Sequence, residues 1–213
     1  MTSVDRPTTD GSDGRDGSPR SRATREAILE AARRCLLDEG IARLSTRSVA
    51  ETAGVPLSQL HYHFGSKQKM VLELLEAENE RRLARQTAMY AEDRPLWQRY
   101  EQACDFLEDD LDSGYVRVLQ EMIAVGWSDP AIGDRVRELL LGWFDLLTDV
   151  CRDAERELGS LGPFTAEELG ALISQLFMGG ESMLLLGFDR ARWPVRAALR
   201  RLGVLIRQLE EGT

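Results

Sequence analysis

The feature that most constrains the fold is the run from Thr46 to Lys67, which reads TRSVAETAGVPLSQLHYHFGSK. Ala50 and Gly54 lie four residues apart, and Leu60 follows six residues later. A small residue suits the place where two helices touch, a glycine suits the turn, and an apolar residue anchors the second helix. The spacing therefore predicts a helix-turn-helix.

The second helix of this motif is predicted over residues 57–64. Helical spacing directs Leu60 and Phe64 inward against Val49 and Val55. The other side chains face outward or sideways, and their types are those that bind base edges and phosphates in DNA. The residues expected to contact DNA are Thr46, Arg47, Leu57, Ser58, Gln59, His61, Tyr62, His63 and Lys67.

Three of these positions have specific expectations. Lys67 lies in the first turn of the next helix, where free backbone N–H groups favour a phosphate. Gln59 lies in the first turn of the second helix of the motif, and its amide suits paired hydrogen bonds to adenine. Leu57 fits either the core or a contact with a thymine methyl group, and the sequence leaves both open.

Histidine and cysteine spacing gives no sign of a metal site or a cofactor. His61 and His63 are the two histidines of the chain. On an α-helix, the side chains of residues i and i+2 point in directions about 200° apart, so these two histidines do not share one metal ion. Cys35, Cys104 and Cys151 are widely spaced, without a CxxC pair, which predicts buried free thiols.

Charge is divided unevenly along the chain. The net charge is −9, yet residues 20–69 hold nine Lys and Arg against five Asp and Glu. A basic N-terminal module on an acidic body suits a protein that docks one end on phosphates. The apolar runs are too short for the roughly 20 residues that span a membrane, and residues 1–20 read as a flexible tail without a secretory core. We expect a cytoplasmic, nucleoid-associated protein without membrane contact.

The segments between turn residues have helical periodicity, which predicts an all-α fold of about nine helices. Thr46 is expected to cap the first helix of the motif, Ser66 the long fourth helix, and Thr165 the penultimate helix in a capping box with Glu168. The predicted domains are a tail over residues 1–20, a DNA-binding domain over 21–68 and a helical ligand-binding and dimerisation body over 69–213.

The body holds more aromatic and sulfur-containing side chains than a plain helical bundle needs. They fit the apolar lining of a ligand pocket that includes a few polar groups such as Gln120, Glu121 or Ser174. Ordinary core packing is the alternative for each of them. The residues assigned to the pocket are Trp97, Tyr100, Cys104, Leu107, Tyr115, Leu119, Met122, Ile123, Trp127, Trp143, Phe144, Leu147, Phe177 and Met178.

The last two helices carry broad apolar faces with spacings of three and four. Such faces fit either core packing or the pairing of two copies of the chain. The residues assigned to a dimer interface are Leu169, Leu172, Leu176, Gly180, Met183, Leu184, Val195, Leu199, Leu202, Ile206 and Leu209.

Residues 22–75 resemble the N-terminal module of the TetR family of bacterial transcriptional regulators. The most telling positions are Gly40, Thr46, Ala50, Ala53, Gly54, Val55, Tyr62, Phe64, Ser66 and Lys67. The resemblance implies a homodimer paired through its last two helices, with a ligand pocket in each body. It also implies that Tyr62 binds a phosphate. One departure is His61-Tyr62-His63, where the family commonly has an aromatic-His-aromatic order.

These observations together predict a dimeric, ligand-responsive regulator, most simply a repressor of a palindromic double-stranded operator. The expected effector is a small apolar or amphipathic molecule. A DNA-binding regulator without a small-molecule ligand is the first alternative. A helical enzyme is the second, and it is disfavoured because the chain has no GxSxG, Walker loop or HExxH motif, while Asp109 and Asp110 diverge on a helix.

Overall fold

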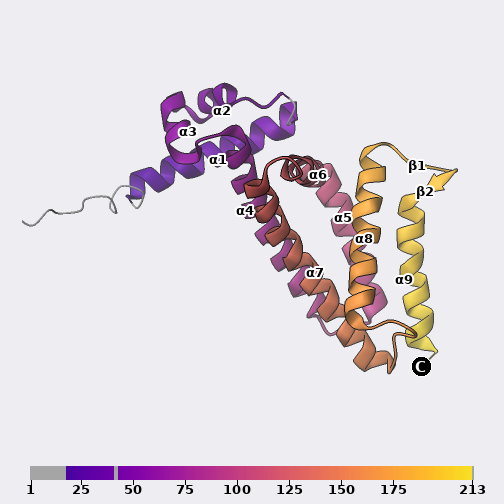
Figure 1. Cartoon of the computed structure of the whole chain (residues 1–213). Helices are drawn as coiled ribbons and strands as arrows, with labels where there is room; N and C mark the ends of the chain where they lie inside the picture. The colour runs from indigo at the N-terminus through magenta and orange to yellow at the C-terminus, as the bar shows by residue number, and fades with distance from the viewer. Residues whose placement is uncertain (1–17, 41–42, 213) are drawn as a thin grey trace, which may run out of the picture. The chain divides into compact units, whose positions relative to one another are not determined.

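The fold is all-α, as predicted, in a computed structural model that describes residues 18–40 and 43–212 (Figure 1). Residues 1–17 of the predicted tail lie outside the described residues. Within the described ranges the helices are α1 (Pro19–Glu39), α2 (Thr46–Ala53), α3 (Leu57–Phe64), α4 (Lys67–Tyr90), α5 (Leu96–Asp112), α6 (Tyr115–Gly126), α7 (Pro130–Leu158), α8 (Ala166–Leu185) and α9 (Val195–Glu211). Between α8 and α9, β1 (Asp189–Arg190) pairs antiparallel with β2 (Trp193–Pro194), a short hairpin that helical periodicity did not predict. The first helix starts at Pro19, within the predicted tail of residues 1–20, because Ser18 caps it and proline is favoured in a first turn.

The chain divides into two compact units after Met70. The first unit holds α1 to α3, where α1 packs against α2 and α3. The second unit holds the body, in which α7 packs along α8, α5 along α9 and α6 against α7. None of the helices in the described ranges is long and apolar enough to span a membrane.

Side-chain caps define where two helices begin. The hydroxyl of Ser45 accepts a hydrogen bond from the Ser48 N–H at 3.0 Å, so Ser45 caps α2. The prediction that Thr46 is the cap was wrong by one residue, because the backbone is extended at Ser45 and Thr46 is already helical. The predicted capping box of α8 is confirmed, with Thr165 and Glu168 exchanging hydrogen bonds of 3.0 and 3.2 Å.

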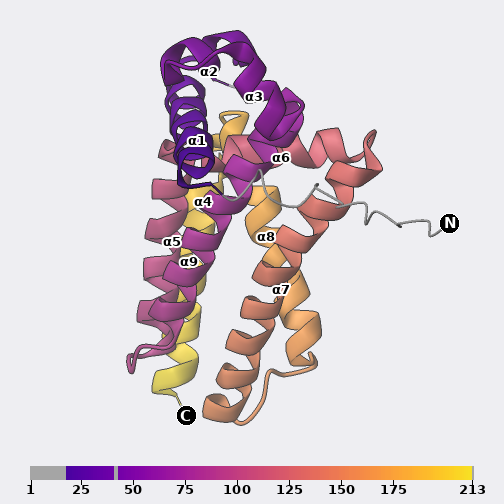
Figure 2. The same cartoon turned by 90° about the vertical axis from the view of Figure 1, so that its left-hand side faces the viewer.

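A glycine brings α7 and α8 close together, and Figure 2 shows the two helices side by side in the body. A Cβ atom added at Gly170 of α8 would lie 2.8 Å from the Thr148 hydroxyl and 3.0 Å from the Thr148 Cα. These distances are too short for any side chain larger than hydrogen. Gly170 therefore fixes how closely the two helices approach.

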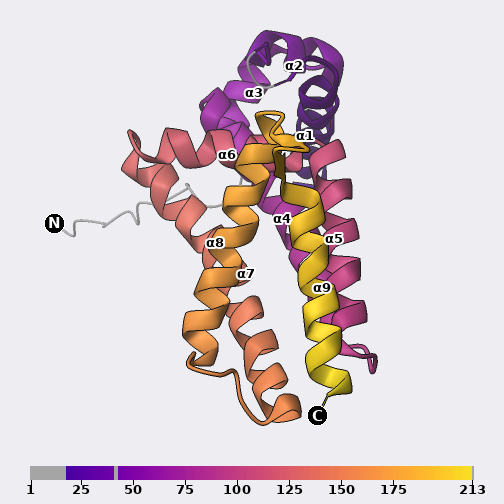
Figure 3. The same ribbon diagram turned by 90° about the vertical axis from the view of Figure 1, so that its right-hand side faces the viewer.

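The last helix is tied to the start of α5, which lies beside it (Figure 3). Pro95 precedes α5 and provides no side-chain cap. The Glu210 carboxylate takes that place and accepts hydrogen bonds from the N–H groups of Leu96 at 2.7 Å and Trp97 at 2.9 Å. A carboxylate at a helix N-terminus is stabilised by the free N–H groups and the helix dipole.

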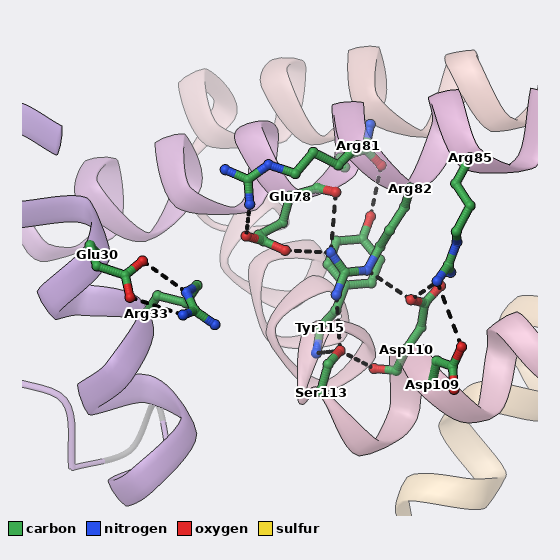
Figure 4. A network of polar contacts seen from close by, with 11 residues as sticks. Glu30, Arg33, Glu78, Arg81, Arg82, Arg85, Asp109, Asp110, Ser113 and Tyr115 are labelled. Atoms are coloured by element: carbon green, nitrogen blue, oxygen red, sulfur yellow. Dashed lines mark hydrogen bonds and ion pairs between the residues drawn. The ribbon is translucent and has the colours of Figure 1, made fainter.

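A charged network joins α4 to α5 inside the body (Figure 4). Asp110 accepts hydrogen bonds from Arg82 at 2.8 Å and Arg85 at 3.0 Å, and Arg82 also pairs with Glu78. Burial raises the pKa of Asp110, while the two arginines oppose the rise. Positive and negative groups are thus matched within this network.

Candidate nucleic-acid interface and body cavity

The helix-turn-helix is held by the residues that its spacing places inside. Val49, Ala50, Leu60 and Phe64 are buried, whereas Val55 is only half-buried. Gly54 closes α2 in the left-handed region, with φ 67° and ψ 30°, and its N–H donates to the Ala50 carbonyl. The turn therefore needs a glycine, and the interior fixes α3 against α2.

One side of α3 faces solvent with the residues expected to contact DNA. Ser58, Gln59 and His61 are exposed, and Tyr62 is 58% exposed. Leu57 is 36% exposed, which favours the thymine-methyl contact over a core position. The exposed surface supports the predicted role of this helix.

The neighbouring positions lie at two helix starts. Arg47 is exposed at the start of α2, while Thr46 beside it is half-buried. Lys67 is half-buried at the start of α4, where the Ser66 hydroxyl accepts a hydrogen bond from the Lys69 N–H at 3.2 Å. Both starts present backbone N–H groups of the kind that bind phosphate.

The two histidines of α3 have different surroundings. His61 Nδ1 lies 3.2 Å from the Gly65 carbonyl oxygen, a contact that needs the proton on Nδ1. The half-buried His63 ring stands edge-to-face with the Tyr62 ring, with 5.1 Å between centroids. No group of three His, Cys, Asp or Glu side chains in the described part of the chain is arranged to hold a metal ion.

Comparison with known proteins agrees with this geometry. Residues 28–74 match the family model described as "Bacterial regulatory proteins, tetR family". This part of the chain is therefore similar to the DNA-binding domain of that family. The transcriptional regulator TtgR of Pseudomonas putida and the probable regulator ArpR of the same species are each 37% identical over 60 residues, which is 28% of this chain and 29% of each relative. The chain thus matches less than a third of the length of these curated relatives.

Solved structures resemble the fold over most of its length. A TetR-family regulator from a Rhodococcus species has a TM-score of 0.67 at 20% identity, with 87% of this chain and 98% of that chain covered. A regulator from Saccharomonospora viridis, solved in complex with choline, has a TM-score of 0.69 at 22% identity, covering 87% of this chain and 96% of that one. At these identities the likeness establishes the TetR-like fold.

A cavity of about 100 Å³ lies inside the body, between α4, α5, α6, α7 and α8. Eight residues of the predicted pocket line it, together with Ser174: Leu107, Tyr115, Leu119, Trp143, Phe144, Leu147, Phe177 and Met178. The other lining residues were not predicted from the sequence; they are Gln86, Tyr90, Ala103, Asp110, Val116, Leu140, Leu146 and Glu181.

Six predicted pocket residues do not line this cavity: Trp97, Tyr100, Cys104, Met122, Ile123 and Trp127. Trp127 is 83% exposed just after α6. The Tyr100 hydroxyl donates to the Leu199 carbonyl at 2.8 Å, and Arg207 covers the Trp97 ring at 4.9 Å, so both side chains contact α9 instead. The polar candidates Gln120 and Glu121 do not line the cavity either.

Most polar groups around the cavity already have partners. Asn79 Oδ1 accepts from the Tyr115 hydroxyl and from Trp143 Nε1, both at 2.7 Å. The Ser174 hydroxyl donates to the Gly170 carbonyl at 2.7 Å. These three donors are therefore committed within the protein.

Glu181 differs from these groups. Gln120 Nε2 donates to its carboxylate at 3.5 Å, the long limit of a hydrogen bond. Burial raises the pKa of Glu181 to about 7, against the lowering effect of Gln120 and with a smaller upward contribution from Asp110. A signal in the sequence marks this residue, because Ser174, Phe177 and Glu181 share one face of α8 at spacings of three and four.

The surface of α8 and α9 holds only part of the predicted dimer interface. Leu172 is 53% exposed, Leu176 and Leu209 are also exposed, and most of the others are half-buried. Two assignments need correction: Leu184 and Leu199 are 9% and 4% exposed, so they belong to the core of the body. The Leu199 side chain lies under α8, where a Cβ at Gly180 would stand 3.5 Å from it.

Proposed function

We propose that the chain is a ligand-responsive transcriptional repressor that binds a palindromic double-stranded operator as a homodimer. The observation that carries this proposal is the TetR-family helix-turn-helix, in which Leu60 and Phe64 are buried while the polar side of α3 is exposed. We place its site of action in the cytoplasm, on the nucleoid.

The division of roles on DNA follows from position. Ser58 and Gln59, in the first turn of α3, enter the major groove and read base edges, with Leu57 against a thymine methyl group. Arg47, Tyr62 and Lys67 bind backbone phosphates and fix the register. Thr46, His61 and His63 complete the surface with further hydrogen bonds.

Two copies of the chain pair through the exposed apolar side of α8 and α9. Leu172, Leu176 and Leu209 supply that surface, and the similarly exposed Val204 and Leu205 extend it. Pairing places two α3 helices about 34 Å apart, one turn of DNA, which matches two half-sites of a palindrome.

The body cavity is the proposed effector site. A ligand that binds better to one body arrangement shifts the protein toward it, and an arrangement that misplaces the two α3 helices releases DNA. By linkage, DNA weakens ligand binding by the same factor. The choline complex of the Saccharomonospora viridis regulator, which has this fold, supports a small-molecule site in such a body.

Selection from a random-sequence duplex library tests the DNA-binding proposal. The full chain is expected to enrich a palindrome, and its affinity is expected to fall steeply with salt. The Ser58→Ala/Gln59→Ala variant, which keeps the buried residues, is the control and should lose the enrichment. A folded dimer that enriches no palindrome would refute the proposal.

A regulator without a small-molecule ligand is distinguished by thermal shift across a panel of compounds. A ligand at 100 times its dissociation constant should stabilise the folded protein by about 2.7 kcal/mol. Operator binding with no response across a broad panel would favour the constitutive regulator.

A further inference from the structure

The body cavity has an uneven supply of polar groups. Two acceptors in its lining have few donors: the Glu181 carboxylate receives one long hydrogen bond, from Gln120 at 3.5 Å, and the Gln86 amide oxygen is buried without a hydrogen-bond partner. The donors of Tyr115, Trp143 and Ser174 are used inside the protein. A ligand that complements this cavity brings hydrogen-bond donors with it.

The charge of Glu181 is also uncompensated. The nearby carboxylate of Asp110 has Arg82 and Arg85 as partners, and Figure 4 shows these arginines directed at Asp110 and at Glu78 and Asp109. Within the described part of the chain, no ion pair reaches Glu181. A half-buried, desolvated carboxylate such as Glu181, without a cationic partner, is stabilised when a proton or a bound cation neutralises it.

The rest of the lining suits the apolar part of such a ligand. Trp143, Phe144 and Phe177 line the same cavity as Glu181, together with the Tyr115 ring. Aromatic faces attract ammonium groups through their quadrupoles and also pack against hydrocarbon. The volume of about 100 Å³ restricts the ligand to a compact molecule.

We propose that the body cavity binds a compact organic cation, an ammonium with an apolar or aromatic substituent, whose charge pairs with the Glu181 carboxylate. The inference rests on the proposed effector site and names its ligand class. The bound cation replaces the proton that otherwise neutralises Glu181, so binding releases a proton when the carboxyl is protonated beforehand.

Two probes of nearly the same shape test the charge requirement. Phenethylammonium and 2-phenylethanol differ in an ammonium against a hydroxyl, and both are titrated into the full chain by calorimetry at pH 8. The ammonium is expected to bind at least tenfold more tightly, as charge-assisted hydrogen bonds allow. Equal binding of the two probes, or no binding of either at millimolar concentration, overturns the proposal.

Glu181→Gln keeps the shape of the side chain and removes its charge. The variant is expected to bind both probes alike, whereas Glu80→Gln, an exposed change on α4 outside the cavity, should leave the preference intact. A Glu181→Gln protein that keeps the full preference overturns the proposal. Circular dichroism verifies that each variant is folded.

The pH dependence gives a readout that a packing role for Glu181 would not produce. With a pKa of about 7, the carboxylate fraction falls about tenfold between pH 8 and pH 6, and affinity for phenethylammonium should fall with it. The other titratable groups lining the cavity are Asp110 of α5, which is paired with Arg82 and Arg85, and the tyrosines Tyr90 and Tyr115; the lining residues of α7 are apolar or Trp143. Affinity that is flat between pH 6 and pH 8 contradicts the pairing.

A protein that selects a palindrome but fails these tests retains the proposed function and loses only this inference.

Discussion

Replacing Glu181 by glutamine should stabilise the ligand-free protein, and more so at high pH. The folded state raises the Glu181 pKa from an ordinary 4.5 to about 7, chiefly because the carboxyl is buried. A raised carboxyl pKa means that the folded state holds the proton more tightly than the unfolded state. The contribution of Glu181 to the free energy of unfolding is therefore greatest below pH 4.5 and is lost as the pH rises to about 7.

The size of the effect follows from the same two pKa values. One pKa unit corresponds to about 1.4 kcal/mol, so ionised Glu181 lowers the free energy of unfolding by about 3 kcal/mol at pH 8 and by about 1 kcal/mol at pH 5. Glutamine has no charge to bury. The variant should therefore exceed the wild type by about 3 kcal/mol at pH 8 and by much less at pH 5.

Urea unfolding followed by circular dichroism measures this difference at both pH values. Protein concentration is held fixed, because association contributes to apparent stability. Glu80→Gln removes the same charge from an exposed position and is the matched control. A Glu181→Gln protein that is no more stable than the wild type at pH 8 would refute the reasoning from burial.

Three further predictions concern other parts of the chain. Gly170→Ala should lower the free energy of unfolding, measured by heat or urea, by about 1–3 kcal/mol, because its Cβ would overlap Thr148. Ala171→Ser, at the exposed next position, is the control and should cost about 0.5 kcal/mol; equal effects would contradict the close approach of α7 and α8. Lys67→Ala should weaken binding to all DNA sequences and reduce the slope of log affinity against log salt by about one. Gln59→Ala should instead relax specificity at one base pair by about 1–3 kcal/mol. Fluorescence anisotropy with operator variants separates the two effects, and an unchanged salt slope for Lys67→Ala would argue against its phosphate contact. Leu176→Arg should turn dimers into folded monomers in light scattering, whereas Leu184→Ala should destabilise the protomer by about 2–5 kcal/mol; a Leu176→Arg dimer would place the interface elsewhere.

The bounds of α3 were predictable because local residues define them. Pro56 precedes the helix and Gly65, with φ 73°, ends it, so both ends depend on chain-local conformations. The N-cap of α2 was harder, since Ser45 and Thr46 are adjacent and both carry a hydroxyl. Only the backbone angles decide which one is the cap.

The cavity could be predicted only in part, because periodicity identifies an apolar face without naming its neighbour. On α5, Ala103, Leu107 and Asp110 line the cavity, whereas Tyr100 and Trp97 contact α9. Both faces contain apolar residues at helical spacing, so the choice between them depends on tertiary packing. The same ambiguity placed Leu184 and Leu199 in the dimer interface when each is buried within one protomer.

Glu210 links distant parts of the sequence in a way that affects how the chain is handled. Its carboxylate completes the first turn of α5 from a position 113 and 114 residues further along the chain. A deletion of residues 210–213 would leave two N–H groups of α5 without their acceptor, so its damage would appear at residues 96 and 97. Removing Glu210 therefore changes the first turn of α5. An affinity tag is better attached beyond Glu210 than substituted for it.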